Sequence, residues 1–195
     1  MLNINNKEEV ESFKLSLIKA KKEGNPFFYK NIIDTVPDWS SFLQCTYDLT
    51  NRKNEIIQKT ADSKRGEVAV GSVHIRNSFY ISPHTSNADI ETYFKEVLDI
   101  YNIINEAFGI TFEFRGPKIS IGEHFFGLHQ DPLDAYTIHC QGSTKWTIES
   151  ANGVITEYDL NPGDFLFFPQ KAKHGLLIDK PRAGLIFFGN IDPNF

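Results

Sequence analysis

The stretch FFGLHQDPLDAYTIHCQGSTKW, residues 125–146, carries a histidine and a carboxylate two positions apart at the end of a β-prone run. Because side chains at i and i+2 of a strand point to the same face, His129 and Asp131 could both reach one metal ion. The pair alone is weak evidence, since about one His-x-acid pair is expected by chance among 6 histidines and 25 acidic residues. Its meaning depends on the surrounding sequence.

A third candidate ligand, His174, follows 45 residues after His129. It comes after PGDFLFFPQKAK, which is typical of a turn, a strand and a short loop. Two histidines and one carboxylate on one side of a metal form the facial triad of non-haem Fe(II) oxygenases, which leaves positions open for O₂ and a co-substrate. An alternative interpretation makes His129 a strand-end histidine, Asp131 a turn residue and His174 a surface residue. The other histidines have no comparable setting: His74, His84, His124 and His139.

From residue 110 to the end, short β-prone segments alternate with turn residues, and no helical pattern separates them. Eight or nine strands at nearly regular spacing predict an antiparallel barrel or a double-sheet jelly roll. The Asn-Pro-Gly-Asp sequence at 161–164 suits a tight turn, because glycine at the third position accepts positive φ. We therefore expect a mainly β core that carries the metal site.

The N-terminal half reads as mostly helical. Apolar residues recur at helical spacing over residues 6–24 and again over 86–109, with capping residues before each run and a glycine at its end. A short strand is expected within 26–33, a helix with Trp39, Phe42 and Leu43 on one side, and a polar loop over 51–66. We predict one domain, 1–195, with a helical layer in 1–109 and a jelly-roll core in 110–195.

Composition and charge exclude several classes of protein. The net charge of −5 and the absence of a long basic block argue against nucleic acid or anionic lipid as a partner. Two cysteines without a CxxC pair fit a reducing compartment. The N-terminus has no signal-peptide pattern, and no apolar run reaches the roughly 18 residues of a membrane span. We expect a cytoplasmic protein; its oligomeric state is open.

The segments HQDPLDAYTIHCQGSTKW and YDLNPGDFLFFPQKAKHGLL resemble the Jumonji-C branch of the cupin superfamily, the 2-oxoglutarate-dependent Fe(II) oxygenases. In that family an HxD motif precedes a strand that ends in a Gly-x-(x)-Lys-x-Trp type element, and a PGD, strand, Pro, loop, His segment follows. GNPFFYKNIIDTVPDWSSF resembles the start of the family, a short strand followed by a helix with a tryptophan. The resemblance implies a mainly β fold with flanking α-helices: a double-stranded β-helix, the cupin jelly roll, preceded by N-terminal helices.

The resemblance also implies roles for particular residues. His129, Asp131 and His174 would bind Fe(II), and Lys145 would pair with the distal carboxylate of 2-oxoglutarate, which needs a cation when buried. Arg182, at the start of the last strand, is the alternative cation. Further hydrogen bonds to the co-substrate are expected from Thr137, Tyr136 or Asn190. The presence of Asp131 argues against halogenation, because related iron halogenases have a small residue there.

The sequence departs from the family pattern in two places, one before the first histidine and one on the last strand. Phe126 stands where a hydroxyl residue is common, and Ile186 and Phe187 stand where the last strand often carries a polar contact to the co-substrate. We expect an apolar wall around the metal from this set: Phe125, Phe126, Trp146, Phe165 and Phe167. Glu123, His124 and the 51–66 loop are candidates for the entrance to the site.

The sequence therefore predicts an oxygenase that uses Fe(II), O₂ and 2-oxoglutarate to hydroxylate a small molecule, an amino acid or a peptide residue. One alternative is a cupin metal dioxygenase that binds its substrate directly and does not use 2-oxoglutarate, and another is a non-catalytic cupin binding module. A nucleophilic hydrolase is a distant third, because the sequence has no GxSxG elbow and no glycine-rich phosphate loop.

Overall fold

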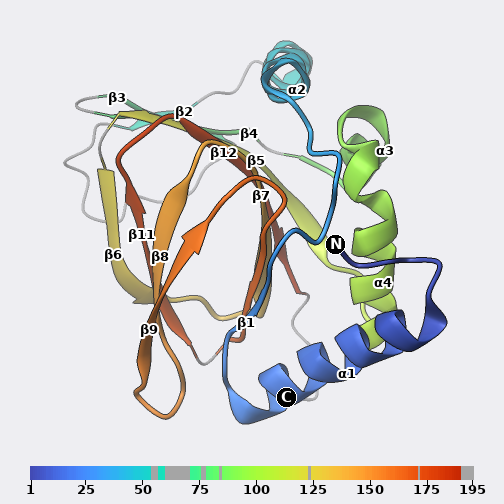
Figure 1. The fold of residues 1–195 in the computed structure, drawn as a ribbon. Coiled ribbons are helices and arrows are strands. Elements are labelled where there is room, and N and C mark those ends of the chain that lie inside the picture. The colour runs from blue at the N-terminus through green and yellow to red at the C-terminus, as the bar shows by residue number, and fades with distance from the viewer. Residues whose placement is uncertain are drawn as a thin grey trace.

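The protein, analysed as a computed structural model, is built mainly from antiparallel β-sheet, with helices along one side (Figure 1). The structure describes residues 1–53, 57–59, 71–75, 78–83, 85–122, 124–170 and 172–189; side chains at 50–59, 71–83 and 124–125 are not described. The helical elements are α1 (Lys7–Glu23), α2 (Trp39–Lys53), α3 (Ala88–Tyr93), the 3₁₀ turn η1 (Lys95–Val97) and α4 (Leu98–Phe108).

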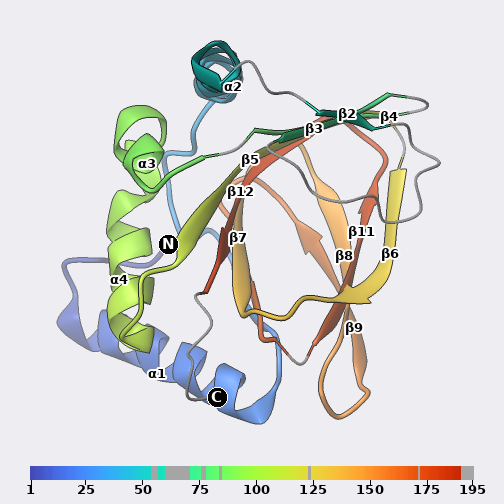
Figure 2. The ribbon, with the colours of Figure 1, turned by 180° about the vertical axis from the view of Figure 1, so that it is seen from behind.

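Two sheets face each other (Figures 1 and 2). The strands before residue 110 are β1 (Phe27–Tyr29), β2 (Ile57–Lys59), β3 (Gly71–Ile75) and β4 (Ser78–Pro83). Those after it are β5 (Glu113–Gly122), β6 (His124–Gln130), β7 (Ala135–Gln141), β8 (Thr144–Glu149), β9 (Ile155–Leu160), β10 (Phe165–Phe168), β11 (Lys173–Ile178) and β12 (Arg182–Phe188). The large sheet has the order β1-β10-β7-β12-β5-β4-β3-β2, and the small sheet has the order β6-β11-β8-β9.

The strands from β5 to β12 are shared between the two sheets: β5, β7, β10 and β12 belong to the large sheet, and β6, β8, β9 and β11 to the small one. This arrangement is consistent with the expected jelly roll. At one edge, the Phe28 ring of β1 contacts the Tyr158 ring of β9, with centroids 5.7 Å apart, so an aromatic pair joins the edge strands of the two sheets.

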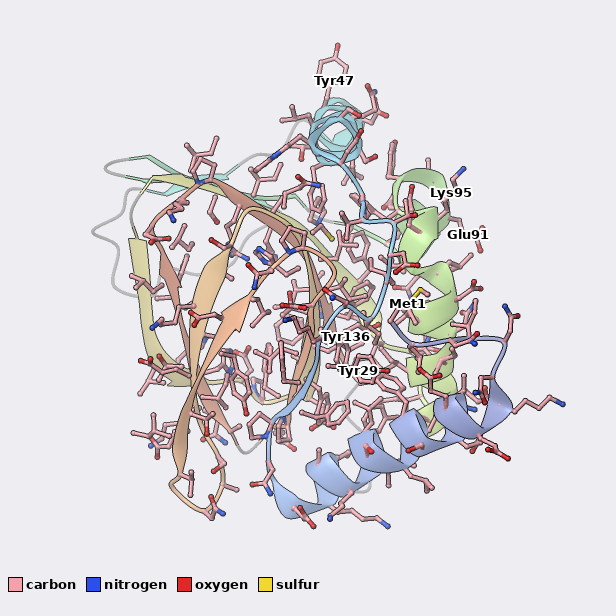
Figure 3. All side chains as sticks on the ribbon, in the orientation of Figure 1. Met1, Tyr29, Tyr47, Glu91, Lys95 and Tyr136 are labelled. Atoms are coloured by element: carbon pink, nitrogen blue, oxygen red, sulfur yellow. The ribbon has the colours of Figure 1, made fainter. Side chains whose placement is uncertain are left out.

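The large sheet separates two apolar cores. Its outer face packs on the helices through a cluster that includes Phe13 of α1, Phe94 and Ile104. Its inner face, which turns toward the small sheet, contributes to a second cluster with Trp146 and Phe168. Figure 3 shows Tyr136 and Tyr29 on the helix side of the large sheet. The helices thus cover one face of the large sheet, and the other face is free to line the site.

The predicted helix ends are confirmed at α1. Asn6 accepts hydrogen bonds from the backbone N–H groups of Glu8 and Glu9, and Gly24 ends the helix at φ 67°. Three buried residues of α1 come from the predicted apolar stripe: Phe13, Leu17 and Ala20. The sequence pattern therefore located this helix to within a residue or two.

Other expectations need correction. The single helix predicted over 86–109 is α3, η1 and α4, because the chain leaves helical geometry at Phe94 (φ −138°, ψ 40°). Leu43 is exposed rather than packed beside Phe42. The segment read as a polar loop, 51–66, contains the end of α2 and strand β2, and its remaining residues lie outside the described part of the chain.

The β-prone region after residue 110 opens with one long strand, β5. Its pairing with β12 shifts register between Leu185 and Phe187, opposite Gly116, which has φ 98°. Such a bulge changes which residues point to each face of a strand. Phe114 before it and Ile119 after it both join the helix-side core, although they are five positions apart and regular alternation would put them on opposite faces. Lys118 and Ser120 consequently turn toward the small sheet.

Among the helices of the described residues, none combines the length and the apolar character needed to cross a bilayer.

Candidate metal centre

The structure brings His129, Asp131 and His174 together at one end of the two sheets. His129 is near the end of β6, Asp131 follows that strand, and His174 is near the start of β11. One ligand atom from each residue lies within 4.8 Å of the others. The β6–β11 pairing sets His129 directly opposite His174, and Nε2 of His174 is 3.4 Å from Oδ2 of Asp131.

Hydrogen bonding orients the histidine of β6. Nδ1 of His129 lies 2.9 Å from the carbonyl oxygen of Gly127, which acts as acceptor when Nδ1 carries the proton. Nε2 then holds a lone pair suited to a metal ion. A backbone carbonyl on the distal nitrogen is a common way in which proteins fix the tautomer of a metal-binding histidine.

His174 is the most buried member of the triad, with 4 % of its surface exposed. Its Nδ1 has no hydrogen-bond partner among the described residues. The ring lies against Phe168, with centroids 4.4 Å apart, and near Trp146, with centroids 6.1 Å apart. A buried imidazole flanked by aromatic rings is costly to desolvate unless its nitrogens are satisfied, and a bound ion would satisfy one of them.

The donor set fits Fe(II). Two imidazoles and one carboxylate from one side are the ligands of the non-haem iron facial triad, and they leave the opposite positions for other ligands. Only these three residues form a group of candidate metal ligands among the residues that the structure describes. The residues therefore fit the ion that the sequence implied.

The apolar wall differs in part from the expectation. Trp146 and Phe168 belong to the inner cluster, and Phe126 packs against it. Phe165 and Phe167 were wrongly expected there: both join the helix-side core, because strand alternation turns them away from the small sheet. The side chain of Phe125 lies outside the described set. Leu166 and Phe168 of β10 occupy the inner face instead.

The backbone of Gln170 connects the two segments that carry the ligands. Its N–H donates to Oδ1 of Asp134, and its carbonyl oxygen accepts from Nε2 of Gln130, both at 2.9 Å. Oδ2 of Asp134 is also 2.8 Å from Nζ of Lys21 on α1. Gln130 and Asp134 flank Asp131, and Gln170 precedes His174 by four residues. We call this group, Lys21, Gln130, Asp134 and Gln170, the ligand clamp.

Arg182 begins β12 at the end of the inner face remote from the triad, since the chain runs from His174 through β11 before it reaches β12. Arg182 is buried, with 3 % of its surface exposed. Burial and then the charge of Arg182 lower the pKa of His139 to about 3, so that imidazole is neutral near pH 7. Nε2 of His139 lies 3.1 Å from the Gly142 carbonyl oxygen.

Thr137 is also buried, and its hydroxyl donates to the Leu185 carbonyl oxygen at 3.0 Å. In the β7–β12 register Thr137 is opposite Ile186, whose side chain packs against the inner cluster. Thr137 therefore lies on the inner face, as a co-substrate contact would require. Its own hydrogen is committed to the backbone, so it can offer a ligand only lone pairs in this arrangement.

Lys145 does not lie with the triad. On β8 its neighbours Thr144 and Trp146 are buried, whereas Lys145 is on the opposite, outer face. Its Nζ pairs with Oε2 of Glu157 at 3.1 Å, and the hydrogen bond to Glu157 raises the pKa of Lys145. Strand alternation thus directs this lysine away from the space where the sequence placed the co-substrate.

Another candidate, Tyr136, is not available as a co-substrate contact. Tyr136 is fully buried in the helix-side core, where its ring stacks on Phe187 with centroids 4.5 Å apart. Asn190 lies outside the described residues, as do Glu123 and the side chain of His124. The structure therefore gives Asn190, Glu123 and the His124 side chain no position relative to the triad.

Sequence reasoning missed Lys118 and Ser120 on β5, and the ligand clamp. The period-two pattern of KISIG sets Lys118 and Ser120 on one face and Ile119 on the other, so the signal was present. Which face turns inward depends on the bulge at Gly116, and the sequence did not reveal it. The clamp rests on contacts between residues far apart in the chain, for which a single sequence carries no signal.

Comparisons with known proteins give a fold but no family. No family profile and no curated protein matches this sequence. Solved structures do match. An oxidoreductase of the 2OG-Fe(II) oxygenase family from Burkholderia pseudomallei is 11 % identical with a TM-score of 0.53, and the match covers 95 % of this chain and 91 % of that one.

Two further structures match over most of this chain. A prolyl hydroxylase from Trichoplax adhaerens, in complex with a peptide fragment of the hypoxia-inducible factor, has 9 % identity and a TM-score of 0.54; the match covers 93 % of this chain and 90 % of that one. The non-heme alpha-ketoglutarate-dependent epimerase SnoN of nogalamycin biosynthesis has 10 % identity and a TM-score of 0.50, with coverage of 92 % and 83 %. At such identities the likeness shows a shared fold.

Proposed function

We propose that this protein is a non-haem Fe(II) oxygenase that uses 2-oxoglutarate. The observation that carries the proposal is the convergence of His129, Asp131 and His174 at one end of the facing sheets, with the buried cation Arg182 at the other end of the same inner face. A facial triad needs open coordination positions, and a dianionic co-substrate that chelates the metal needs a cation for its far end. The shared fold with 2-oxoglutarate enzymes supports this reading.

In this proposal His129, Asp131 and His174 hold the metal. When bound, Fe(II) would supply the chemistry by which O₂ oxidises 2-oxoglutarate to succinate and CO₂ and adds one oxygen atom to a substrate. The ligand clamp keeps the HxD segment against the loop before His174. Trp146 and Phe168 exclude water from the imidazole of His174.

The cation that receives the distal carboxylate is, in our proposal, Arg182 rather than Lys145. Arg182 is buried on the inner side, and a guanidinium can bind a carboxylate through two parallel hydrogen bonds. Lys145 is engaged with Glu157 on the outer face. Thr137 lies on the inner face, and its hydroxyl would donate to the co-substrate only by turning away from the Leu185 carbonyl oxygen. Asn190 stays a candidate contact from the sequence alone.

We further propose the finer assignments that the sequence suggested. The core of residues 110–195 would be a cupin-type double-stranded β-helix of the Jumonji-C branch, and residues 1–195 would be a single domain with the helical layer of 1–109 on one side. Cys45 and Cys140 are both buried free thiols, which supports a reducing compartment such as the cytoplasm.

The proposed reaction is hydroxylation of a small molecule, an amino acid or a residue of a peptide. The Trichoplax structure contains a peptide fragment, and that observation belongs to that enzyme. The aromatic side chains beside His174 favour a substrate that presents a carbon–hydrogen bond from an apolar group.

The test is O₂-dependent formation of succinate from 2-oxoglutarate by the protein supplied with Fe(II), measured by proton NMR. Slow succinate formation without substrate, abolished in His174→Ala, would support the proposal. An added compound that accelerates it and gains one oxygen atom would identify the substrate. Stoichiometric Fe(II) binding without any succinate, over a screen of potential substrates, would contradict it.

A second candidate function is a metal dioxygenase that binds its substrate directly to the metal. Phe126 and Ile186, both apolar and packed against the inner cluster, favour it, because they offer no hydrogen bond to a 2-oxo acid. This enzyme would consume O₂ in the absence of 2-oxoglutarate. A non-catalytic binding module would instead keep its biological activity after His129→Ala.

A further inference from the structure

The indole of Trp146 carries a buried hydrogen-bond donor without an acceptor. Trp146 is on the inner face of β8, with 5 % of its surface exposed. Its Nε1 is shielded from solvent and has no hydrogen-bond partner among the described residues. An indole has one N–H donor, and burial removes the water that would otherwise accept from it. Because an unsatisfied buried donor is costly, this group is suited to an acceptor that comes from outside the protein.

The contrast with a neighbouring donor singles out Trp146. Thr144 is the preceding inward-facing residue of β8, and its hydroxyl donates to the Leu177 carbonyl oxygen at 2.8 Å. The groups beside the indole are different in kind. Leu176 is opposite Trp146 on β11, and the Phe168 ring lies 5.4 Å away between centroids. Neither side chain has an oxygen or nitrogen atom that could accept the N–H.

The indole lies beside the metal centre. His174 is two residues before Leu176 on β11, so it is the diagonal neighbour of Trp146 on the same face of the small sheet. The two ring centroids are 6.1 Å apart, and the Phe168 ring lies against both. Trp146 is thus one row further in than the metal ligand His174, toward the end of the inner face at which Arg182 lies.

The chemistry of the co-substrate narrows the choice of acceptor. A 2-oxo acid that chelates the metal does so through its 2-oxo oxygen and the adjacent carboxylate. In 2-oxoglutarate two methylene groups follow, and they carry no acceptor. The far carboxylate is assigned to Arg182. The chelating carboxylate keeps a second oxygen that is not needed by the metal, and an anionic oxygen is a stronger acceptor than a neutral one.

We infer that the indole N–H of Trp146 donates to the carboxylate through which the co-substrate binds the metal. The inference rests on the proposed function and deepens it by naming a residue that orients the chelating end of the co-substrate. A chelate can take more than one pair of the positions that a facial triad leaves open. A hydrogen bond from one side selects among them, and so determines which position is left for O₂.

The first experiment observes the indole directly. The chain contains two tryptophans, Trp39 and Trp146, so a ¹⁵N–¹H NMR spectrum has two indole signals, which Trp39→Phe assigns. Trp39 packs against the helix-side core and serves as the internal reference. The protein is loaded with Zn(II), a diamagnetic replacement for Fe(II), and titrated with 2-oxoglutarate. We expect the Trp146 proton signal to move to higher frequency and to become protected from solvent exchange, while the Trp39 signal stays in place.

The second experiment measures affinity. Wild type, Trp146→Phe and Trp39→Phe are loaded with Fe(II) and titrated anaerobically with 2-oxoglutarate or with 2-oxopentanoate, while the visible charge-transfer band is recorded. The second acid has the same chelating end but a methyl group in place of the far carboxylate. Trp146→Phe keeps an aromatic ring beside Phe168 and lacks the N–H. It should raise both dissociation constants by the same factor, roughly 10–100-fold, as expected for the loss of a hydrogen bond to a charged group. Trp39→Phe should behave as wild type.

The outcomes separate this inference from the proposed function. An unmoved Trp146 signal in wild type that binds 2-oxoglutarate would overturn the inference and leave the proposed function intact, and this readout holds even if Trp146→Phe folds poorly. A loss of affinity in Trp146→Phe for 2-oxoglutarate but not for 2-oxopentanoate would also overturn it, because the N–H would then serve the far end. Failure of metal-loaded wild type to bind either acid would instead refute the proposed function.

Discussion

His129 and His174 are directly opposite each other in the antiparallel β6–β11 pair, with ring centroids 4.4 Å apart. The register shifts just after this pair, at Gly175. A Cβ at Gly175 would lie 2.9 Å from the carbonyl oxygen of Phe126, an atom of the neighbouring backbone that cannot rotate away. The close approach of the two strands, which aligns the two histidines, therefore requires glycine at 175.

Gly175→Ala should push β11 away from β6 and separate the two imidazoles. We expect weaker Fe(II) binding together with a loss of about 1–3 kcal/mol in the free energy of unfolding, as for other overpacked sites. Competition with a chromophoric chelator and urea unfolding measure the two effects. Gly153→Ala is the control, since nothing lies within 4 Å of a Cβ there although φ is 81°. It should cost stability but leave Fe(II) affinity unchanged; equal metal affinity in both variants would argue against the strand-spacing account.

Arg182→Met should abolish tight binding of 2-oxoglutarate, because it leaves the far carboxylate without its principal buried cation. Lys145→Met should leave the dissociation constant of 2-oxoglutarate unchanged, because the Lys145 side chain is on the outer face beside Glu157. Anaerobic titration of both Fe(II)-loaded variants tests the pair. If Lys145→Met weakened 2-oxoglutarate binding and Arg182→Met did not, Lys145 would be the cation that binds the far carboxylate.

Stability should fall in acid because of His139. Its pKa in the folded protein is about 3, below the ordinary value of 6.5, so the unfolded chain binds a proton that the folded protein does not. The stability that this neutral histidine contributes is complete above pH 6.5 and is lost toward pH 3, at a rate approaching ~1.4 kcal/mol per pH unit. Urea unfolding of the metal-free protein between pH 4 and 7 should show a steeper slope in wild type than in His139→Gln. Parallel curves would show that His139 binds its proton equally well in the folded and unfolded states, and would contradict the lowered pKa.

The ligand clamp should strengthen Fe(II) binding by holding the segment of His129 and Asp131 at a fixed position relative to the loop before His174. Asp134→Ala removes the acceptor of the Gln170 N–H and the partner of Lys21. Because Asp134 acts on the ligands only through the backbone, we expect Fe(II) affinity to fall by about tenfold or less, at the low end of the loss seen when a direct partner of a metal ligand is removed. Asp159→Ala is the control, because Asp159 is an exposed carboxylate on β9. The chelator competition assay reads out affinity, and the electron paramagnetic resonance spectrum of Co(II)-substituted protein reads out ligand geometry. An unchanged spectrum and an unchanged Fe(II) affinity in Asp134→Ala would show that the ligand clamp does not position the metal ligands.

Much of the β core could be predicted because its signals are local. Alternating side chains, the turn at Gly163 and the ends of α1 all depend on residues close in sequence, and the structure contains each of them. The candidate triad was accessible for the same reason, since HxD and the PGD-to-histidine segment are short patterns.

What the sequence could not supply is the direction of particular side chains. Lys145 was assigned inward, but one step along β8 separates it from the inward-facing Thr144 and Trp146. Lys118 was overlooked, because the bulge at Gly116 reverses the alternation of β5. The break at Phe94 was hidden because its apolar side chain continues the helical stripe even where the backbone does not. These outcomes depend on tertiary packing, which a single sequence does not encode in a readable pattern.

The central claim is tested most directly by anaerobic titration of the metal-free protein with Fe(II) and then 2-oxoglutarate, while the visible absorption spectrum is recorded. The account predicts stoichiometric Fe(II) binding and a metal-to-ligand charge-transfer band that appears on addition of 2-oxoglutarate in wild type and is weak or absent in Asp131→Ala. Stoichiometric Fe(II) binding without that band would contradict the 2-oxoglutarate assignment and favour direct binding of the substrate to the metal, and failure to bind Fe(II) would contradict the metal centre itself.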